Sequence, residues 1–398
     1  MRMTQTEARG PLKGLRVVEL GQLIAGPFCG QLMADFGAEV IKVEPPVTGD
    51  AMRQWGRPGK DGKPVWWEVI ARGKRSITLD LRQEEGQQVL RDLAATADVL
   101  IENFRPGTME RWGLGYDTLS TLNPRLIMVR VSGFGQDGPY AERAGFASVC
   151  EAMGGLRAIS GYPDRPPVRV GLSLGDTMAG INAAMGVLLA LQHRHASGRG
   201  QVVDSSIFES VLHLTEAMVV EFGAVHYLPT PAADGRDVII GANQDSVYRR
   251  LCEAMGRPEL ADDPDYADHR ARGRNAEALD ALISDWTRQL TADQIVARMN
   301  DAGVPVGLAY TAREMIDDAH FKAREAVVRV PDGKGGSLAM QNVFPRLSAS
   351  PGGVRGLGPA LGQDTQEVLS HTLRYDNSRI AALAKSGVIG TEVERSTS

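Results

Sequence analysis

Apolar and polar positions along the first half of the chain predict strands and helices in alternation. Residues 15–44 have the pattern of a strand, a glycine-containing turn, a helix and a second strand. Further strands are predicted at 76–81, 99–101, 126–131 and 201–207, with helices at 84–97 and 176–192. Strands that alternate with helices pair in parallel, so the pattern predicts an α/β fold with a doubly wound, mostly parallel sheet.

The pattern changes beyond about Tyr227, where a segment rich in Pro, Gly and Asp precedes shorter elements. One strand at 238–241 and helices at 247–255, 276–289 and 292–299 predict a second, smaller α+β domain. We therefore expect a large domain at 1–215, a linker at 216–235, the small domain at 236–331, a linker at 332–357, and C-terminal helices at 358–398 that return to the large domain.

Composition excludes several classes of protein. The 398 residues carry a net charge of −5, which argues against a sequence-independent nucleic-acid binder. Cys29, Cys150 and Cys252 are far apart, and His193 with His195 lie near a predicted helix end, so we expect neither disulfides nor a metal site. No apolar run reaches the length of a membrane span and the start lacks a secretory signal, which predicts a cytoplasmic protein without a membrane partner.

The first turn and two basic segments suggest a nucleotide-like ligand. Gly21, Gly26 and Gly30 depart from the G-x-G-x-x-G spacing of dinucleotide-binding proteins, so a different cofactor is expected. The basic residues of segments 71–82 and 102–113 are Arg72, Lys74, Arg75, Arg82, Arg105 and Arg111. Guanidinium groups bind phosphate bidentately, so these segments are suited to a phosphorylated adenosine; the alternative is an ordinary solvated surface.

Asp176 stands directly before the longest apolar helical run of the chain. Aspartate is a preferred N-cap residue, and this is the simpler interpretation. A carboxylate at a helix start is also held ionised by the aligned N–H groups, and Gly175 leaves room for a substrate carbonyl. An ionised, positioned carboxylate can act as a covalent nucleophile, so both interpretations stay open.

Motifs along most of the chain resemble those of the family III CoA-transferases. They are LKGLRVVELGQLIAGP, FGAEVIKVEPP, KRSITLDLR, ENFRPG, LGYD, NPRLIMVRVSGFGQDGPY, the Gly175–Asp176 pair, GRGQVVDSSIFESVL, LCEAMGRPEL, GVPVG, MQNVFP and GPALGQDTQEVL. The resemblance implies a Rossmann-like large domain and an interlocked homodimer in which each ring-shaped chain is threaded by its partner. It also implies coenzyme A thioesters as substrates, with no permanently bound cofactor and no metal.

The resemblance further implies that Asp176 is the catalytic nucleophile, which passes through a mixed anhydride and an aspartyl-CoA thioester. The positions that match CoA-contacting segments are Ile24, Ala25, Arg75, Leu79, Asp80, Leu81, Arg82, Asn103, Phe104, Arg105, Arg111, Arg143, Ala144, Gly145 and Phe146. Ile24, Pro45 and Phe146 differ from the formyl-CoA branch, which has glutamine, arginine and tyrosine there. The chain is therefore closest in type to succinyl-CoA-dependent dicarboxylate CoA-transferases, with succinyl-CoA or a similar donor and a short-chain carboxylic or dicarboxylic acceptor.

Two alternatives to a transferase remain. The same family includes α-methylacyl-CoA racemases, which pair an aspartate with a histidine for proton exchange. Phe146 occupies the position of that histidine, and phenylalanine cannot move a proton, so the transferase is favoured. The second alternative is a CoA-binding protein without catalysis, in which Asp176 only caps its helix. The short connection at 222–234 leaves the lining of the acyl pocket unassigned.

Overall fold

The chain folds into two units, each with its own core. The computed structural model describes residues 10–56, 64–142, 145–157, 160–161, 170–215, 230–242, 245–308, 327–333, 335–342 and 353–390, with single positions at 168, 317, 322 and 325. The first unit comprises Met1–Gly161, Pro167–Ala224 and Glu325–Ser398, and the second comprises Tyr162–Pro166 and Val225–Arg324. The first unit therefore draws on both ends of the sequence.

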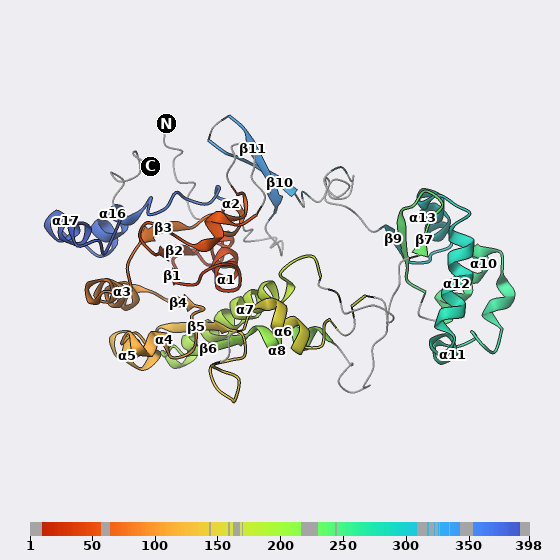
Figure 1. Ribbon diagram of the computed structural model, residues 1–398, viewed down its shortest axis with the longest axis horizontal. Coiled ribbons are helices and arrows are strands. Elements are labelled where there is room, and N and C mark those ends of the chain that lie inside the picture. Colours follow the sequence, from red (N-terminus) through yellow and green to blue (C-terminus); the bar gives the residue numbers. More distant parts are fainter. Residues whose placement is uncertain are drawn as a thin grey trace. The chain divides into compact units, whose positions relative to one another are not determined.

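A six-stranded parallel sheet forms the centre of the first unit (Figure 1). Its strands are β1 (Arg16–Glu19), β2 (Glu39–Glu44), β3 (Arg75–Thr78), β4 (Val99–Glu102), β5 (Ile127–Ser132) and β6 (Val202–Ser206). They lie in the order β3-β2-β1-β4-β5-β6, which confirms the predicted doubly wound α/β fold. The first three strands extend the sheet in one direction from β1, and the next three extend it in the other direction from β4, so the strand order reverses between β1 and β4. Sheets of this kind bind ligands in the crevice beyond the carboxyl ends of the strands at this switch point.

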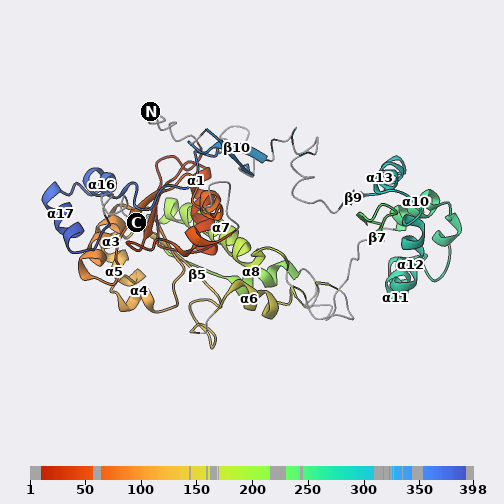
Figure 2. The ribbon, with the colours of Figure 1, turned by 45° about the horizontal axis from the view of Figure 1, so that its top comes forward.

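Helices cover both faces of this sheet (Figure 2). In chain order they are α1 (Ala25–Asp35), the 3-10 turn η1 (Ala51–Gln54), α2 (Trp66–Ile70), α3 (Glu84–Thr96), α4 (Thr108–Arg111), α5 (Tyr116–Leu122), α6 (Ala147–Met153), α7 (Leu174–Ser197), α8 (Ile207–Leu212) and the 3-10 turn η2 (His213–Thr215). The central strands β1, β4 and β5 carry apolar side chains on both sides, as expected for a sheet buried on both faces. Val18 packs in the core on the α3 side, whereas its neighbour Val17 packs in the core on the side of α1 and α7.

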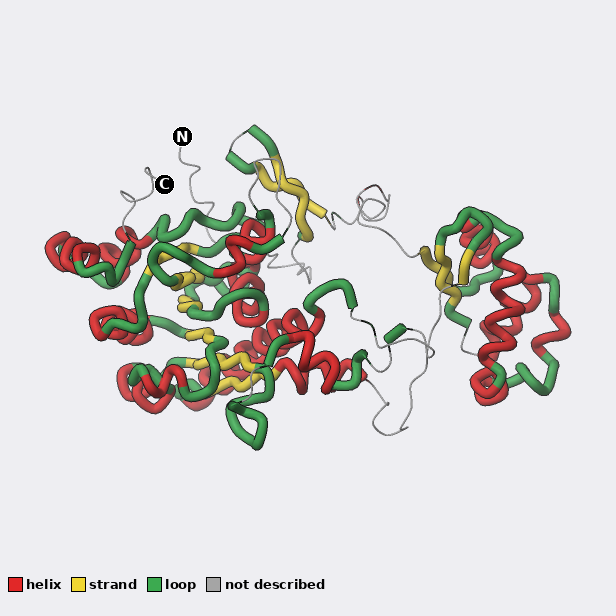
Figure 3. Tube along the Cα trace, in the orientation of Figure 1, coloured by secondary structure: helices red, strands yellow, loops and turns green. Residues whose placement is uncertain are grey.

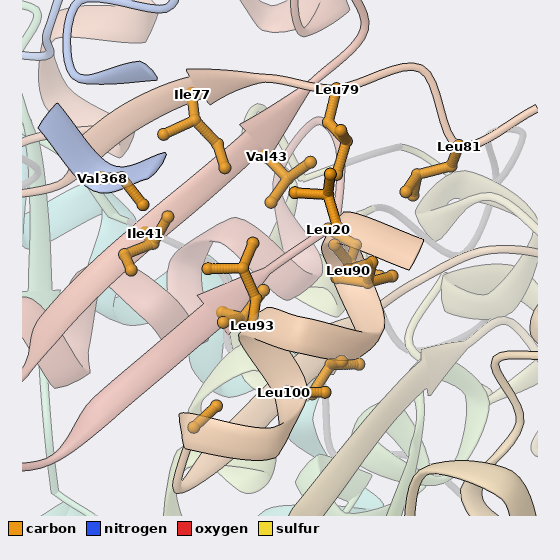
Figure 4. Close-up of a cluster of buried hydrophobic side chains, with 14 of the residues drawn as sticks. Leu20, Ile41, Val43, Ile77, Leu79, Leu81, Leu90, Leu93, Leu100 and Val368 are labelled. Atoms are coloured by element: carbon orange, nitrogen blue, oxygen red, sulfur yellow. The ribbon is translucent and has the colours of Figure 1, made fainter. Parts of the chain in front are cut away.

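The C-terminal segment completes the core on the α3 side, part of which is drawn in Figure 4. It contains α16 (Thr365–Glu367), the π-helical turn η4 (Val368–Thr372) and α17 (Asn377–Lys385). Val368 packs against the cluster around Leu90 and Leu93. The Ser76 and Thr78 N–H groups each donate, at 3.0 Å, to side chains of this segment, so it also covers the edge strand β3.

Residues 332–341 differ from the predicted linker. They form the turn and second strand of an antiparallel hairpin of β10 (Val327–Pro331) and β11 (Ser337–Gln341). Gly333 and Gly335 adopt φ values of 69° and 89° in the turn, a conformation that glycine adopts without steric cost. Two of the glycines that suggested an extended linker therefore lie in a tight turn.

The second unit is a small α+β unit, whose strands and helices are distinguished by colour in Figure 3. Its three-stranded antiparallel sheet contains β7 (Thr230–Pro231), β8 (Asp237–Ile240) and β9 (Val306–Leu308). Its helices are α10 (Asp245–Met255), the 3-10 turn η3 (Pro258–Ala261), α11 (His269–Arg274), α12 (Ala276–Thr287) and α13 (Ala292–Asp301). Leu251, Ile283 and Ile295 lie in its core. The structure thus confirms that the fold contains a second, smaller α+β unit.

Candidate active site

The loop between β1 and α1 lies at the switch point between β1 and β4, where side chains of other segments hold its backbone in place. Asn103, directly after β4, accepts a hydrogen bond from the Gln22 N–H and donates one to the Gln22 carbonyl, both at 2.8 Å. Asp50 accepts from the Leu23 N–H at 3.1 Å. Leu23 is held with a φ of 64°, which is uncommon for a residue other than glycine and is characteristic of functional sites. The backbone that leads into Ile24 and Ala25 is therefore set by side chains of other elements.

Charged side chains buried beneath this loop form an ion network. The Nζ atom of Lys42 lies 2.8 Å from Asp50 and 3.3 Å from Glu19. Lys74 lies 2.8 Å from the other Glu19 oxygen and donates to the Pro27 carbonyl at 2.7 Å. Burial lowers the pKa of Lys42, but Asp50 and Glu19 outweigh it and raise that pKa above its ordinary value. The network links β1, β2 and the residue before β3 to the loop.

Two basic residues of the predicted phosphate-binding segments form ion pairs inside the protein. Lys74 belongs to the ion network, and Arg72 is buried in a bidentate pair with Asp35 at 2.6 and 3.0 Å. Neither side chain reaches a ligand at the surface. The expectation of either phosphate binding or a solvated surface is wrong for Arg72 and Lys74.

Asp176 lies in the first turn of α7, at the end of the sheet where the strands finish. The helix begins at Leu174 with Ser173 as N-cap, so the interpretation of Asp176 as the N-cap is wrong. The positive end of the helix dipole still favours a carboxylate at this position. Asp176 is half-buried.

Glycines allow the start of α7 to approach its neighbours closely. A Cβ atom on Gly175 would lie 2.9 Å from the Ile207 side chain, which follows the carboxyl end of β6. A Cβ atom on Gly180 would lie 2.8 Å from the Ala25 carbonyl oxygen. The Gly180 contact seats α7 against α1 (Figure 2), one helical turn beyond Asp176.

Asp176 also acts on the thiol of Cys150. Burial, together with the negative charges of Asp176 and Glu151, raises the pKa of Cys150 to about 11. The Cys150 thiol donates to the Gly133 carbonyl at 3.3 Å. At neutral pH the thiol is protonated and does not compete with the carboxylate as a nucleophile.

Most of the other predicted site residues follow the carboxyl ends of their strands. Asn103, Phe104 and Arg105 follow β4, and Arg111 ends α4 shortly after. Gly145 packs against Gly133 at the end of β5, where a Cβ atom on Gly133 would lie 2.6 Å from the Gly145 Cα. Phe146 is the N-cap of α6 and is 63% exposed. Arg143 and Ala144 lie outside the described residues.

The residues around β3 divide into two groups. Leu79, Asp80, Leu81 and Arg82 follow its carboxyl end; the two leucine side chains are buried in the core, and Arg82 is exposed and pairs with Asp80 at 3.0 Å. Arg75 stands at the opposite end of the strand, where it pairs with Glu39 at 2.7 Å and Glu367 at 3.0 Å. The structure thus separates Arg75 from the other predicted CoA contacts by the length of the strand.

The buried carboxyl group of Glu102, at the end of β4, should make the free energy of unfolding depend on pH. Burial raises the pKa of its carboxyl from 4.5 to about 7, although Arg130, which donates to it at 2.8 Å, works in the opposite direction. A folded-state pKa above the unfolded value gives stability that is complete below about pH 4.5 and is lost as the pH rises through about 7. We expect wild type to lose up to about 3 kcal/mol relative to Glu102→Gln over this interval. Urea unfolding between pH 5 and 8 measures this, and a difference independent of pH would contradict it.

No group of His, Cys, Asp and Glu within the described ranges has the arrangement of a metal site. In the same ranges one helix, the 24-residue α7, contains an 18-residue stretch with a mean hydropathy of 1.4 and so has the length and composition to cross a membrane. Ala179, Ala183 and Val187 on this helix are buried in the core of the first unit, as in the core helix of a globular domain.

Comparisons with known proteins agree on one family. The model of CoA-transferase family III matches residues 12–365. The chain is 53% identical over 394 residues to succinyl-CoA–D-citramalate CoA-transferase of Chloroflexus aurantiacus, covering 95% of this chain and 98% of that protein. It is 41% identical to the β subunit of succinyl-CoA–L-malate CoA-transferase from the same organism, covering 97% of this chain and all of that subunit (100%). A crystal structure of an aspartate-to-alanine mutant of Rv3272 from Mycobacterium tuberculosis matches with a TM-score of 0.82 and 31% identity, covering 92% of this chain and 100% of that one.

Proposed function

Because this chain belongs to CoA-transferase family III and is a CoA-transferase, we propose that it moves CoA from succinyl-CoA to a short dicarboxylic acid, with Asp176 as the carrier. The observation that carries the proposal is the position of Asp176, half-buried in the first turn of α7, the helix that packs against α1 through Gly180. The donor is inferred from the names of the two relatives above, which both use succinyl-CoA.

In the proposed reaction the Asp176 carboxylate attacks the thioester carbonyl of succinyl-CoA. The carbon–sulfur bond breaks, CoA thiolate leaves and a mixed anhydride forms. The thiolate then attacks the Asp176 carbonyl, which releases succinate and leaves an aspartyl-CoA thioester. The acceptor carboxylate attacks this thioester to form a second anhydride, and the thiolate finally attacks the acceptor acyl carbon, which frees Asp176. Every intermediate stays activated, so the exchange needs no external source of energy.

CoA is proposed to lie across the carboxyl ends of the strands. Arg82, Arg105 and Arg111 are exposed there and are suited to the phosphates, since guanidinium groups bind phosphate bidentately. The remaining contacts inferred from the resemblance are Ile24, Ala25, Leu79 to Leu81, Asn103, Phe104 and Arg143 to Phe146. No metal and no permanently bound cofactor take part in the proposed route.

A panel of donors and acceptors tests the proposed substrates. We expect turnover with succinyl-CoA and a dicarboxylic acceptor such as D-citramalate or L-malate, measured as new acyl-CoA by liquid chromatography. Turnover only with formyl-CoA and oxalate would contradict the proposed donor. Deuterium exchange at the α-carbon of a 2-methylacyl-CoA without any acceptor would instead support a racemase.

A homodimer is also proposed, in a cytoplasmic protein without a membrane partner. One face of α7 is apolar and open: Ile181, Met185, Leu188 and Leu189 are 41%, 55%, 50% and 64% exposed. A contiguous apolar patch of this kind marks an interaction surface. The family resemblance implies a homodimer, and we infer that the second copy of the chain covers this face.

Leu189→Asp is expected to weaken this dimer, because a charge on the covered face must be desolvated without a partner. Sedimentation velocity should give a dimer for wild type and a monomer or an unstable protein for the variant. Leu122→Asp changes an equally apolar residue, 50% exposed on α5, and should leave the dimer intact. A wild-type protein that is monomeric at micromolar concentration would contradict the proposal.

A further inference from the structure

A loosely paired arginine lies next to the backbone that carries Asp176. Arg157 follows α6, and its Nη2 atom is 3.9 Å from an oxygen of Glu151, beyond hydrogen-bonding distance. Its Nε atom is buried and has no hydrogen-bond acceptor. The second oxygen of Glu151 accepts the Gly175 N–H at 3.2 Å. One carboxylate therefore connects the guanidinium group of Arg157 to the residue before Asp176.

The pairing leaves both groups incompletely satisfied. Glu151 is fully buried, and its oxygen that faces Arg157 accepts no hydrogen bond. Buried polar groups in native proteins are almost always paired, so we interpret the incomplete pairing of Arg157 and Glu151, near the start of α7, as a sign of a ligand contact. The Arg157 side chain is 25% exposed, so the protein does not enclose it fully. Glu151 orients the guanidinium group without filling its five N–H donors.

The chemistry of this group fits a carboxylate. A guanidinium fork binds a carboxylate through two parallel hydrogen bonds, and its charge does not titrate at neutral pH. In the proposed reaction the donor and the acceptor each attach to Asp176 through one carboxyl group. A dicarboxylic acid then presents a second carboxylate a few bonds away, and the same cation can serve both halves of the exchange.

We propose that Arg157 binds the second carboxylate of the donor acyl group and of the acceptor, and that it makes the enzyme selective for dicarboxylic acids. This inference rests on the proposed function, because it requires acyl groups on Asp176. It adds a residue that determines which acids are used, and it assigns Glu151 the task of positioning that residue.

Arg157→Gln tests the assignment. We expect kcat/KM for succinyl-CoA with a dicarboxylic acceptor to fall about 100-fold, mainly through KM, because the second carboxylate loses its partner. Transfer from propionyl-CoA to butyrate should be unchanged or faster. Arg157→Lys keeps the charge but not the fork, and it should recover part of the preference for dicarboxylates.

Arg199→Gln is the matched control. Arg199 is exposed just beyond the far end of α7, roughly 30 Å along the helix from Asp176, and its variant should behave as wild type. If Arg157→Gln keeps the ratio of dicarboxylate to monocarboxylate turnover, the proposal is wrong. If it loses both activities equally while its circular dichroism is native, Arg157 has a general role and the selectivity proposal also fails.

Labelling separates this inference from the proposed function. Saturating succinyl-CoA and hydroxylamine should convert Asp176 to a hydroxamate in both wild type and Arg157→Gln. Label in both proteins with an unchanged acid preference rejects only the role of Arg157. Absence of label in wild type rejects the covalent route itself.

Discussion

Asp176→Asn is expected to lower CoA transfer by at least about 10³-fold while the fold and CoA binding are retained, because an amide of the same size cannot attack a thioester. The N-cap of α7 is Ser173, so capping is not lost, and the smaller interaction with the helix dipole should cost less than about 1 kcal/mol. Steady-state turnover and thermal unfolding of the purified variant measure the two effects.

Asp117→Asn provides the control for this variant. Asp117 also lies in the first turn of a helix, α5, and it is exposed, away from the carboxyl ends of the strands. It should keep full turnover and show a similarly small change in stability. Turnover by Asp176→Asn at the wild-type rate would reject the covalent role and leave Asp176 as a structural residue.

Glu19→Gln is expected to produce the largest loss of stability, about 3–5 kcal/mol in the free energy of unfolding. Glu19 is fully buried and pairs with both Lys42 and Lys74, so the variant leaves two buried ammonium groups without their shared counter-charge. Urea unfolding at pH 7 measures the loss. Because the network also holds Asp50, and Asp50 holds the Leu23 N–H, turnover of the folded fraction should fall as well.

Glu39→Gln is the comparison for this prediction. Glu39 starts the neighbouring strand and pairs with Arg16 and Arg75, but its side chain is 31% exposed. Exposed ion pairs contribute little, so this variant should lose no more than about 1 kcal/mol. Equal stability of the two variants would mean that the buried network does not hold β1 and its loop in place.

The sequence was sufficient to predict the parallel sheet, because β1, β2, β4 and β5 contain short apolar runs and the helix between β3 and β4 has clear periodicity. Residues 84–97 were predicted as a helix and α3 spans Glu84–Thr96, since its acidic start and apolar face are local features. The hairpin of β10 and β11 was not predicted, because the same glycines that make a tight turn also occur in linkers.

The buried charges could not be assigned from sequence. Arg72 meets Asp35 37 residues away, and Lys74 meets Glu19 55 residues away, so only the fold shows that these cations are neutralised inside the protein. A signal was present nevertheless. Glu19 and Lys42 interrupt otherwise apolar strands, and a charge at such a position is retained only with a partner.

The site was predicted in part. The resemblance directed attention to Asp176, but the N-cap was misplaced, because the cap depends on how the chain enters the helix at Ser173. Glu151 and Arg157 were missed altogether. Their contribution comes from the packing of α6 against the start of α7, and nothing in their spacing along the chain relates them to Asp176.

The central claim is that one carboxylate carries the acyl and CoA halves in turn. Incubation with succinyl-CoA, followed by hydroxylamine and peptide mass mapping, tests it most directly, since an activated aspartyl group becomes a hydroxamate at the residue that carried it. We predict a hydroxamate at Asp176 and at no other carboxylate. Sustained product formation with an unmodified Asp176 would contradict the account.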